Sequence, residues 1–170
     1  MRVRAIALAV AAIGLATSAQ AADLLRMQPA PAYNAAAFNF NGFYLGAQGG
    51  GTFGSASVGS LGAVAGANFD ISDPIIAGIE FQGDYLFNGS ASYDFYALGR
   101  LGVVVTNNLL AYGEVGTGSV GGTTNYAFGG GLEYALTDTL SITGEALGTG
   151  AWGASPSATR IQAGLLFHLQ

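Results

Sequence analysis

Ionisable side chains recur at isolated positions along this sequence, and they are the residues most able to do chemistry. Between residues 80 and 160, the ionisable residues that fall on the polar face of alternating segments are Glu80, Asp84, Asp94, Arg100, Glu114, Glu133, Glu145 and Arg160. Paired carboxylates can act as general acid and base, and a guanidinium can bridge carboxylates. No activated nucleophile is visible beside them. The pattern therefore favours ion pairs over catalysis.

The other residue types that support catalysis or ligand binding are few. His168 is the one histidine, and we expect its partners to lie out of reach, which rules out a Ser–His–Asp triad. The chain has no cysteine, which excludes disulfides, thiolate metal sites and a cysteine nucleophile. Asp70 and Asp73 are better explained by a turn before Pro74 than by calcium. We therefore expect no enzyme activity, no cofactor and no metal.

Gly116-x-Gly118-x-x-Gly121 has the spacing of a dinucleotide-binding loop. That loop requires a buried strand before it and a helix after it, and neither is indicated here. We interpret residues 116–122 as a flexible loop.

The composition does not suit an ordinary soluble surface. Of the 170 residues, 9% are charged and 51% are hydrophobic, and lysine is absent, whereas about a quarter of the residues of a soluble domain are charged. The formal net charge is −5. Nucleic acid is excluded as a partner because a phosphate backbone requires a basic surface. The length suits one domain, and most of its surface must face something apolar.

The first 21 residues have the features of a secretory signal peptide. Arg2 and Arg4 precede an apolar run over 5–16, and Ala19-Gln20-Ala21 offers a small-x-small cleavage site. The run is shorter than the roughly 20 residues that a helix needs to cross a bilayer, so a retained anchor is the weaker alternative. We expect cleavage after Ala21.

Residues 22–38 contain Pro29, Pro31 and several alanines, without clean alternation. This composition predicts a Pro/Ala-rich periplasmic linker. A short helix over 22–28 is the alternative.

Residues 39–170 alternate between apolar and polar side chains, as β-strands do. In 75–87, Ile79 and Phe81 fall on one face, whereas Glu80 and Gln82 fall on the other. No apolar stretch of 18 residues follows the signal, so no transmembrane helix is expected. The alternation predicts eight strands, over residues 41–53, 59–69, 75–87, 93–105, 109–115, 124–136, 140–149 and 158–169.

Turn signals separate these segments in two alternating sets. One set lies at 70–74, 106–108 and 137–139, and the other at 54–58, 88–91, 116–122 and 152–157. Such connections predict an up-and-down antiparallel meander. An even strand number brings both termini to the same end, which we expect to be periplasmic.

The charge count decides which face points outward. One face carries the ionisable residues, and the other has almost no charge between the turns. A soluble barrel would make the charged face its whole surface, which would then lack the abundant charge that prevents aggregation. Within lipid, only helices and closed barrels satisfy all backbone polar groups. The sequence therefore predicts an all-β fold: an eight-stranded antiparallel transmembrane β-barrel over residues 39–170, with aromatic girdles near the strand ends.

The inward charges should form a structural network in the lumen. Its expected members are Glu80, Arg100, Glu114, Glu133, Glu145 and Arg160. We expect the two arginines to bridge the four glutamates, and protons or water to balance the excess of acid. Eight strands enclose an interior just wide enough for side chains, so no open pore is expected. A proton or cation pathway is the alternative.

The opening of the first strand resembles a known motif. Residues 39–46 read Asn-Phe-Asn-Gly-Phe-Tyr-Leu-Gly, similar to the Asn-Trp-x-Gly-Phe-Tyr-x-Gly opening of small porin-like outer-membrane proteins of alphaproteobacteria. That family is related in fold to opacity-type proteins and to the membrane domain of OmpA-like proteins. The start Ala22-Asp23-Leu24 before a Pro/Ala stretch is similar too. Phe40 replaces the family's tryptophan, and Gln170 stands where a terminal aromatic is typical.

The favoured function is a structural protein of the Gram-negative outer membrane that contributes to envelope integrity. Its expected partners are outer-membrane lipid, the barrel-assembly machinery and other envelope proteins. One alternative is a ligand-binding or adhesion barrel that acts through Trp152 and the 116–122 loop. Others are a narrow porin-like channel and a barrel enzyme, although such an enzyme needs a histidine near the outer rim.

Overall fold

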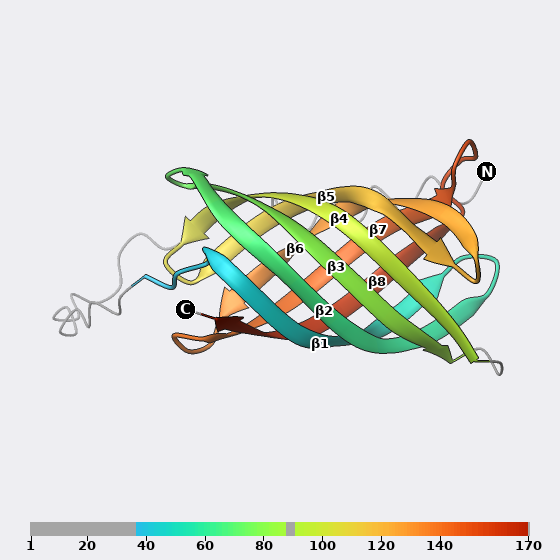
Figure 1. Ribbon diagram of the computed structural model, residues 1–170, viewed down its shortest axis with the longest axis horizontal. Coiled ribbons are helices and arrows are strands. Elements are labelled where there is room, and N and C mark those ends of the chain that lie inside the picture. The colour runs from blue at the N-terminus through green and yellow to red at the C-terminus, as the bar shows by residue number, and fades with distance from the viewer. Residues whose placement is uncertain (1–36, 88–90, 170) are drawn as a thin grey trace, which may run out of the picture. The chain divides into compact units, whose positions relative to one another are not determined.

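The computed structural model describes residues 37–87 and 91–169, which form a closed barrel (Figure 1). The expected signal peptide, 1–21, and the expected linker up to residue 36 lie outside the described residues. The strands are β1 (Gly42–Phe53), β2 (Ser57–Ser72), β3 (Ile75–Phe87), β4 (Ala91–Thr106), β5 (Leu109–Val120), β6 (Thr123–Ala135), β7 (Leu140–Ala151) and β8 (Ala158–Leu169).

Each strand pairs antiparallel with the next, and β8 returns to pair with β1. The predicted eight-stranded meander is therefore confirmed. Among the described residues, no helix is long and apolar enough to cross a bilayer.

The barrel has two different ends. The loop end carries the connections that follow β1, β3, β5 and β7, which include 54–56, 121–122 and 152–157. The terminal end carries the connections 73–74, 107–108 and 136–139, together with the start of β1 and the end of β8. The predicted division of turns into two sets is thus correct.

Four strands, β2, β4, β5 and β7, are longer than the alternation predicts, and β2 and β5 differ most. β2 continues to Ser72 with a register shift between Asp70 and Ser72, and β5 continues to Val120. The interpretation of 116–122 as a flexible loop was wrong, because only 121–122 connect β5 to β6. Gly116 and Gly118 show no alternation because glycine has no side chain. Their backbones nevertheless pair with β4, Gly116 with Leu98 and Gly118 with Tyr96.

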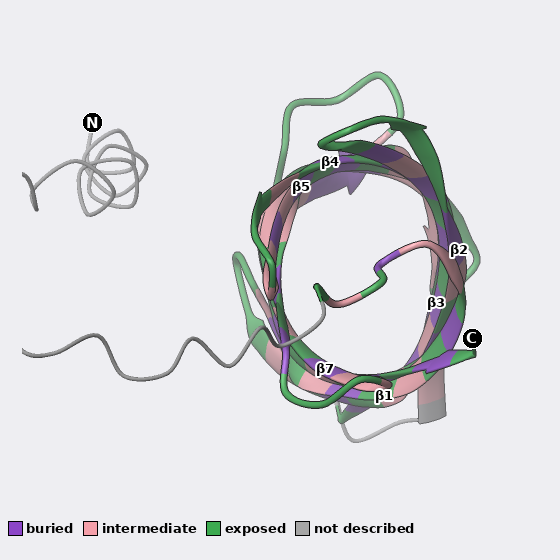
Figure 2. Ribbon diagram, turned by 90° about the vertical axis from the view of Figure 1, so that its left-hand side faces the viewer, coloured by how far each residue is buried: buried purple, intermediate pink, exposed green. Residues whose placement is uncertain are grey.

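Buried and exposed residues alternate along the strands, as the colours of Figure 2 show. The outward positions hold large apolar residues such as Val115, which is 66% exposed, and Leu101, which is 61% exposed. The inward positions hold buried polar residues such as Glu80, Asp84 and Arg160. An apolar exterior around a charged interior reverses the arrangement of a soluble barrel and suits a lipid environment.

The residues just before β1 turn into the terminal end of the lumen. Phe40 is 2% exposed and packs with Ile76, Leu110, Tyr112 and Ala135, and Phe38 lies against the same cluster. The backbone N–H of Phe38 donates to the carbonyl of Asn107 (2.9 Å), and the Asn68 amide donates to the carbonyl of Phe40 (3.0 Å). Figure 2, seen from this end, shows the segment crossing the opening. These residues form an apolar plug that the sequence did not indicate.

The outward face makes a prediction about depth in the bilayer. Val115 lies in the middle of β5, and Val105 lies one residue from the end of β4. Val115→Arg should lower the free energy of unfolding by about 2–4 kcal/mol, because arginine is costly at the bilayer midplane, whereas Val105→Arg should cost about 0–1 kcal/mol. Urea unfolding in phospholipid vesicles measures both. Equal losses would contradict a membrane-spanning β5.

Candidate functional site

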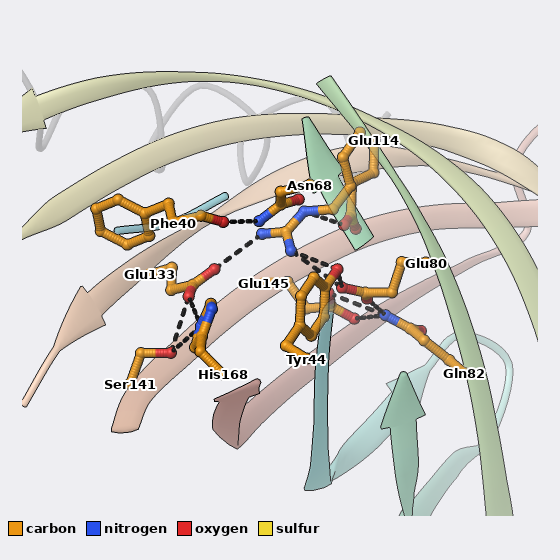
Figure 3. Close-up of polar contacts among 11 residues, drawn as sticks. Phe40, Tyr44, Asn68, Glu80, Gln82, Glu114, Glu133, Ser141, Glu145 and His168 are labelled. Carbon is orange, nitrogen blue, oxygen red and sulfur yellow. Dashed lines mark hydrogen bonds and ion pairs between the residues drawn. The ribbon is translucent and has the colours of Figure 1, made fainter. Parts of the chain in front are cut away.

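Arg100 of β4 lies at the centre of a charged cluster in the lumen, and its partners Glu80, Glu114 and Glu133 are labelled in Figure 3. Its Nη1 is 3.2 Å from Glu80 Oε2 on β3, and its Nε is 3.2 Å from Glu114 Oε1 on β5. Its Nη2 is 3.3 Å from Glu133 Oε2 on β6. All four side chains are almost fully buried, so water screens these ion pairs little. One guanidinium thus connects four consecutive strands.

Two tyrosine rings hold the Arg100 guanidinium in place. Its Cζ lies 3.8 Å from the ring centroid of Tyr112 and 5.4 Å from that of Tyr44, within the range of cation–π attraction. The Tyr44 hydroxyl accepts from Arg100 Nη1 at 2.7 Å and donates to Glu80 Oε2 at 2.6 Å. The phenol therefore reinforces the ion pair rather than competing with it.

Two glycines make room for these rings. Gly66 lies directly opposite Tyr44 on the neighbouring strand, and Gly131 lies directly opposite Tyr112. A Cβ at Gly131 would come within 2.7 Å of the Tyr112 hydroxyl oxygen, and a Cβ at Gly66 would collide with the Tyr44 hydroxyl. Part of the high glycine content therefore serves to let large side chains lie across the lumen.

The second guanidinium lies nearer the loop end and has different partners. Arg160 of β8 forms an ion pair with Asp84, donates to Gln82 Oε1 at 2.6 Å, and lies 5.0 Å from the Tyr96 ring centroid. Gln82 then donates through Nε2 to Glu80 at 2.6 Å and to Glu145 at 3.0 Å. Gln82 thus links the two arginine clusters.

The expected network residues all lie in the lumen, but two partners were not among them. Arg160 contacts Asp84 rather than one of the four glutamates, and Glu145 reaches the network through Gln82. Asp84 and Gln82 share the polar face of 75–87 with Glu80, so the alternation placed them correctly in the lumen. It could not show which arginine each would meet.

Acid exceeds base in the lumen. The buried carboxyl groups are Glu80, Asp84, Asp94, Glu114, Glu133 and Glu145, against two guanidiniums and one imidazole. Glu80, Glu114 and Glu145 form the one group in the described part of the chain whose side chains are close enough together to hold a metal ion. One carboxylate oxygen of each lies within 4.8 Å of those of the other two. The Arg100 guanidinium already contacts two of these three, and supplies part of the positive charge that a metal would bring.

His168 has partners that sequence reasoning placed out of reach. Its Nε2 lies 2.8 Å from Glu133 Oε1 and 3.2 Å from Ser141 Oγ, and the Ser141 hydroxyl also donates to Glu133 at 2.8 Å. That expectation was wrong, because the barrel brings β6, β7 and β8 together. A triad needs the acid on one imidazole nitrogen and the nucleophile on the other. Here both contact Nε2, so the group forms a closed hydrogen-bonded triangle.

The comparisons with known proteins concern the fold. No protein-family model matches the chain, and no curated protein matches it. Three solved outer-membrane barrels are similar, and the first is the N-terminal β-barrel domain of Pseudomonas aeruginosa OprF, with a TM-score of 0.55 and 12% identity over 74% of this chain and 97% of that one. The second is the Yersinia pestis attachment invasion locus protein Ail, with a TM-score of 0.55 and 14% identity over 75% of this chain and 99% of that one. The third is Neisserial surface protein A, with a TM-score of 0.50 and 14% identity over 76% of this chain and 98% of that one. At these identities the likeness shows that the chain has the fold of eight-stranded outer-membrane barrels.

The ion pairs of Arg100 generate a stability prediction. Arg100→Met should lower the free energy of unfolding by about 3–5 kcal/mol, because it leaves buried carboxylates without their positive partner. Adding Glu114→Gln to Arg100→Met should restore part of that loss, since one stranded charge is removed. Urea unfolding in vesicles measures both variants. The network has no such role if Arg100→Met unfolds at the wild-type urea concentration.

Proposed function

We propose that the protein is a structural barrel of the outer membrane that contributes to envelope integrity and does not conduct. The observation that carries this proposal is the combination of an apolar outer surface with a lumen crossed by buried ion pairs. The apolar outer surface suits residence in lipid. The buried ion pairs suit a rigid barrel rather than the passage of ions or solutes.

The location is supported by the surface and by the fold. The large outward side chains are apolar on all eight strands, and a closed ladder leaves no unpaired strand edge in lipid. Chains with this fold include outer-membrane barrels from three Gram-negative sources. We place the terminal end in the periplasm and the loop end outside, with lipid, the assembly machinery and envelope proteins as partners.

A closed lumen is supported by two successive barriers. The apolar plug around Phe40 occupies the terminal end, and the Arg100 cluster crosses the middle. The side chains of Arg160, Glu133 and His168 are each no more than 1% exposed. An ion moving along the axis would have to displace buried charge pairs, which is strongly unfavourable.

A structural role is further supported by the strands that the network joins. Arg100 contacts residues of β1, β3, β5 and β6 across the lumen, and Arg160 of β8 contacts β3. These contacts join opposite walls of the barrel and therefore resist its flattening.

An adhesion role through the loops is less well supported. Ail is an attachment protein by its name, but here the 116–122 segment is mostly strand and Trp152 is engaged locally. The Trp152 indole donates to Thr117 Oγ1 at 3.1 Å and lies 5.7 Å from the Tyr126 ring. These contacts hold the Trp152 side chain, which stays 64% exposed, against β5 and β6 at the rim.

A gel and a conductance trace test the proposal. The protein in the outer-membrane fraction should migrate faster unboiled than boiled, because a closed barrel resists detergent until heated. Added to a planar lipid bilayer, it should leave the current at the protein-free baseline, whereas an open general porin in the same chamber gives steps. A periplasmic band without heat-modifiability would overturn the membrane assignment, and reproducible current steps would establish the narrow channel instead.

Deletion of the gene tests the role in the envelope. Cells without the protein should become more sensitive to detergents and to bulky antibiotics that an intact outer membrane excludes. Growth inhibition curves measure this, and the wild-type gene should restore resistance. Complementation with Arg100→Met should restore less, in proportion to its loss of barrel stability. An unchanged deletion strain would argue against the proposed role.

A further inference from the structure

The lumen contains a cavity at its loop end, beyond the Arg160 cluster. Its volume is about 340 Å³, which is within the range of small-molecule pockets. Its polar lining includes Asp94, Tyr96, Thr123, Asn125 and Thr149. The barriers formed by the Arg100 cluster and the Phe40 plug lie between this cavity and the terminal end. The cavity is therefore a pocket closed at its inner side rather than part of a channel.

Asp94 is a buried acid in this pocket without a matching donor. The residue is 2% exposed, and its Oδ1 has no hydrogen-bond donor among the described residues. Leaving a buried carboxylate oxygen unpaired costs free energy, more so than for a neutral group. Asp94 also lines the pocket, so its carboxylate is the acid beside which a ligand carrying N–H groups would lie.

The neighbours of Asp94 make a cationic ligand more favourable. Asp84 lies directly opposite Asp94 across the β3–β4 ladder, so two acids face the same side of the barrel wall. Asp84 already accepts from Arg160 and from the Gln48 amide at 3.0 Å. No lysine, arginine or histidine lines the pocket in the described part of the chain. Arg160, which pairs with Asp84 and lies 5.0 Å from the ring of the lining residue Tyr96, is the base beside these two acids, so one negative charge is left in excess.

The rest of the lining decides between a metal ion and an organic cation. Calcium requires six to eight oxygen ligands, usually with several carboxylates, whereas the pocket offers Asp94 as its single acid. The lining also includes apolar side chains, among them Val58, Leu86 and Val120. These favour the methylene groups of an organic ligand, and the volume exceeds what one ion fills.

We propose that the loop-end cavity binds a small organic ammonium ion. Its ammonium N–H groups donate to the Asp94 carboxylate and to neighbouring hydroxyl or amide oxygens, and its alkyl part lies against Val58, Leu86 and Val120. This inference goes beyond the structural role, since an envelope-stabilising barrel requires no such ligand. In the orientation proposed above, the pocket faces the exterior of the cell.

The test uses n-butylammonium chloride as the probe and the folded protein purified from membranes in detergent. Isothermal titration calorimetry should show saturable binding with one site per barrel. Uncharged n-butanol and anionic butyrate match the alkyl chain and should not bind measurably. Failure of n-butylammonium to bind, or binding of n-butanol with similar affinity, would overturn the proposal. Binding of calcium in place of n-butylammonium would do the same and would indicate a metal site.

Variants assign the binding to Asp94. Asp94→Asn should weaken n-butylammonium binding about tenfold or more, since it removes the charge of the hydrogen-bond acceptor. Asp73→Asn makes the same change on the exposed turn at the opposite end and should leave the affinity unchanged. Thr149→Leu keeps Asp94 but fills the pocket and should also abolish binding. Heat-modifiability on a gel shows that each variant is folded. Equal affinity for Asp94→Asn and wild type would refute the assignment.

Discussion

The ladder that joins β1 to β8, from Phe43 opposite Leu169 to Phe53 opposite Thr159, is the constraint on which the rest of this structure depends. Without it, two strands would present unpaired N–H and C=O groups to lipid, where no water can satisfy them. Closure removes both edges at once. It also creates an outside and an inside with opposite requirements, and the alternation of each strand supplies apolar side chains to one and polar side chains to the other.

The interior created by closure is too polar to be an apolar core. Its middle is filled by a few large groups that are joined by ion pairs and hydrogen bonds. Arg100 lies between the rings of Tyr44 and Tyr112 and contacts three glutamates. The glycines opposite the two rings are as necessary to this packing as the rings themselves. The same arrangement explains why a lumen with an excess of acid still packs closely.

Along its axis the lumen changes character. The terminal end is apolar around Phe40, the middle holds the Arg100 cluster, and the loop end keeps an open pocket beside Asp94. The two inner layers are consistent with a rigid, closed barrel. The loop-end layer holds the cavity lined by Asp94, which is the part of the lumen that a molecule from outside could enter. The terminal and middle layers therefore suit a structural role, and the loop-end layer suits a small binding pocket.

The sequence by itself determined the number of strands and their antiparallel order, because alternation with a period of two is local and strong over segments such as 75–87. It also determined which face of each strand points outward, because the ionisable residues fall on one face and almost no charge falls on the other. It also placed all six expected network residues in the lumen. Only the tertiary structure decided which of them meet: Arg160 contacts Asp84, and His168 meets Ser141 and Glu133. Those partners come from different strands, and their relative height depends on the stagger of the barrel, which no single segment encodes. The sequence did not indicate the Phe40 plug, because a short irregular segment has no periodic pattern and its place depends on the lumen that receives it. The extension of β5 through Gly116 and Gly118 was missed because a glycine has no side chain to show alternation, and only its pairing with β4 reveals the strand.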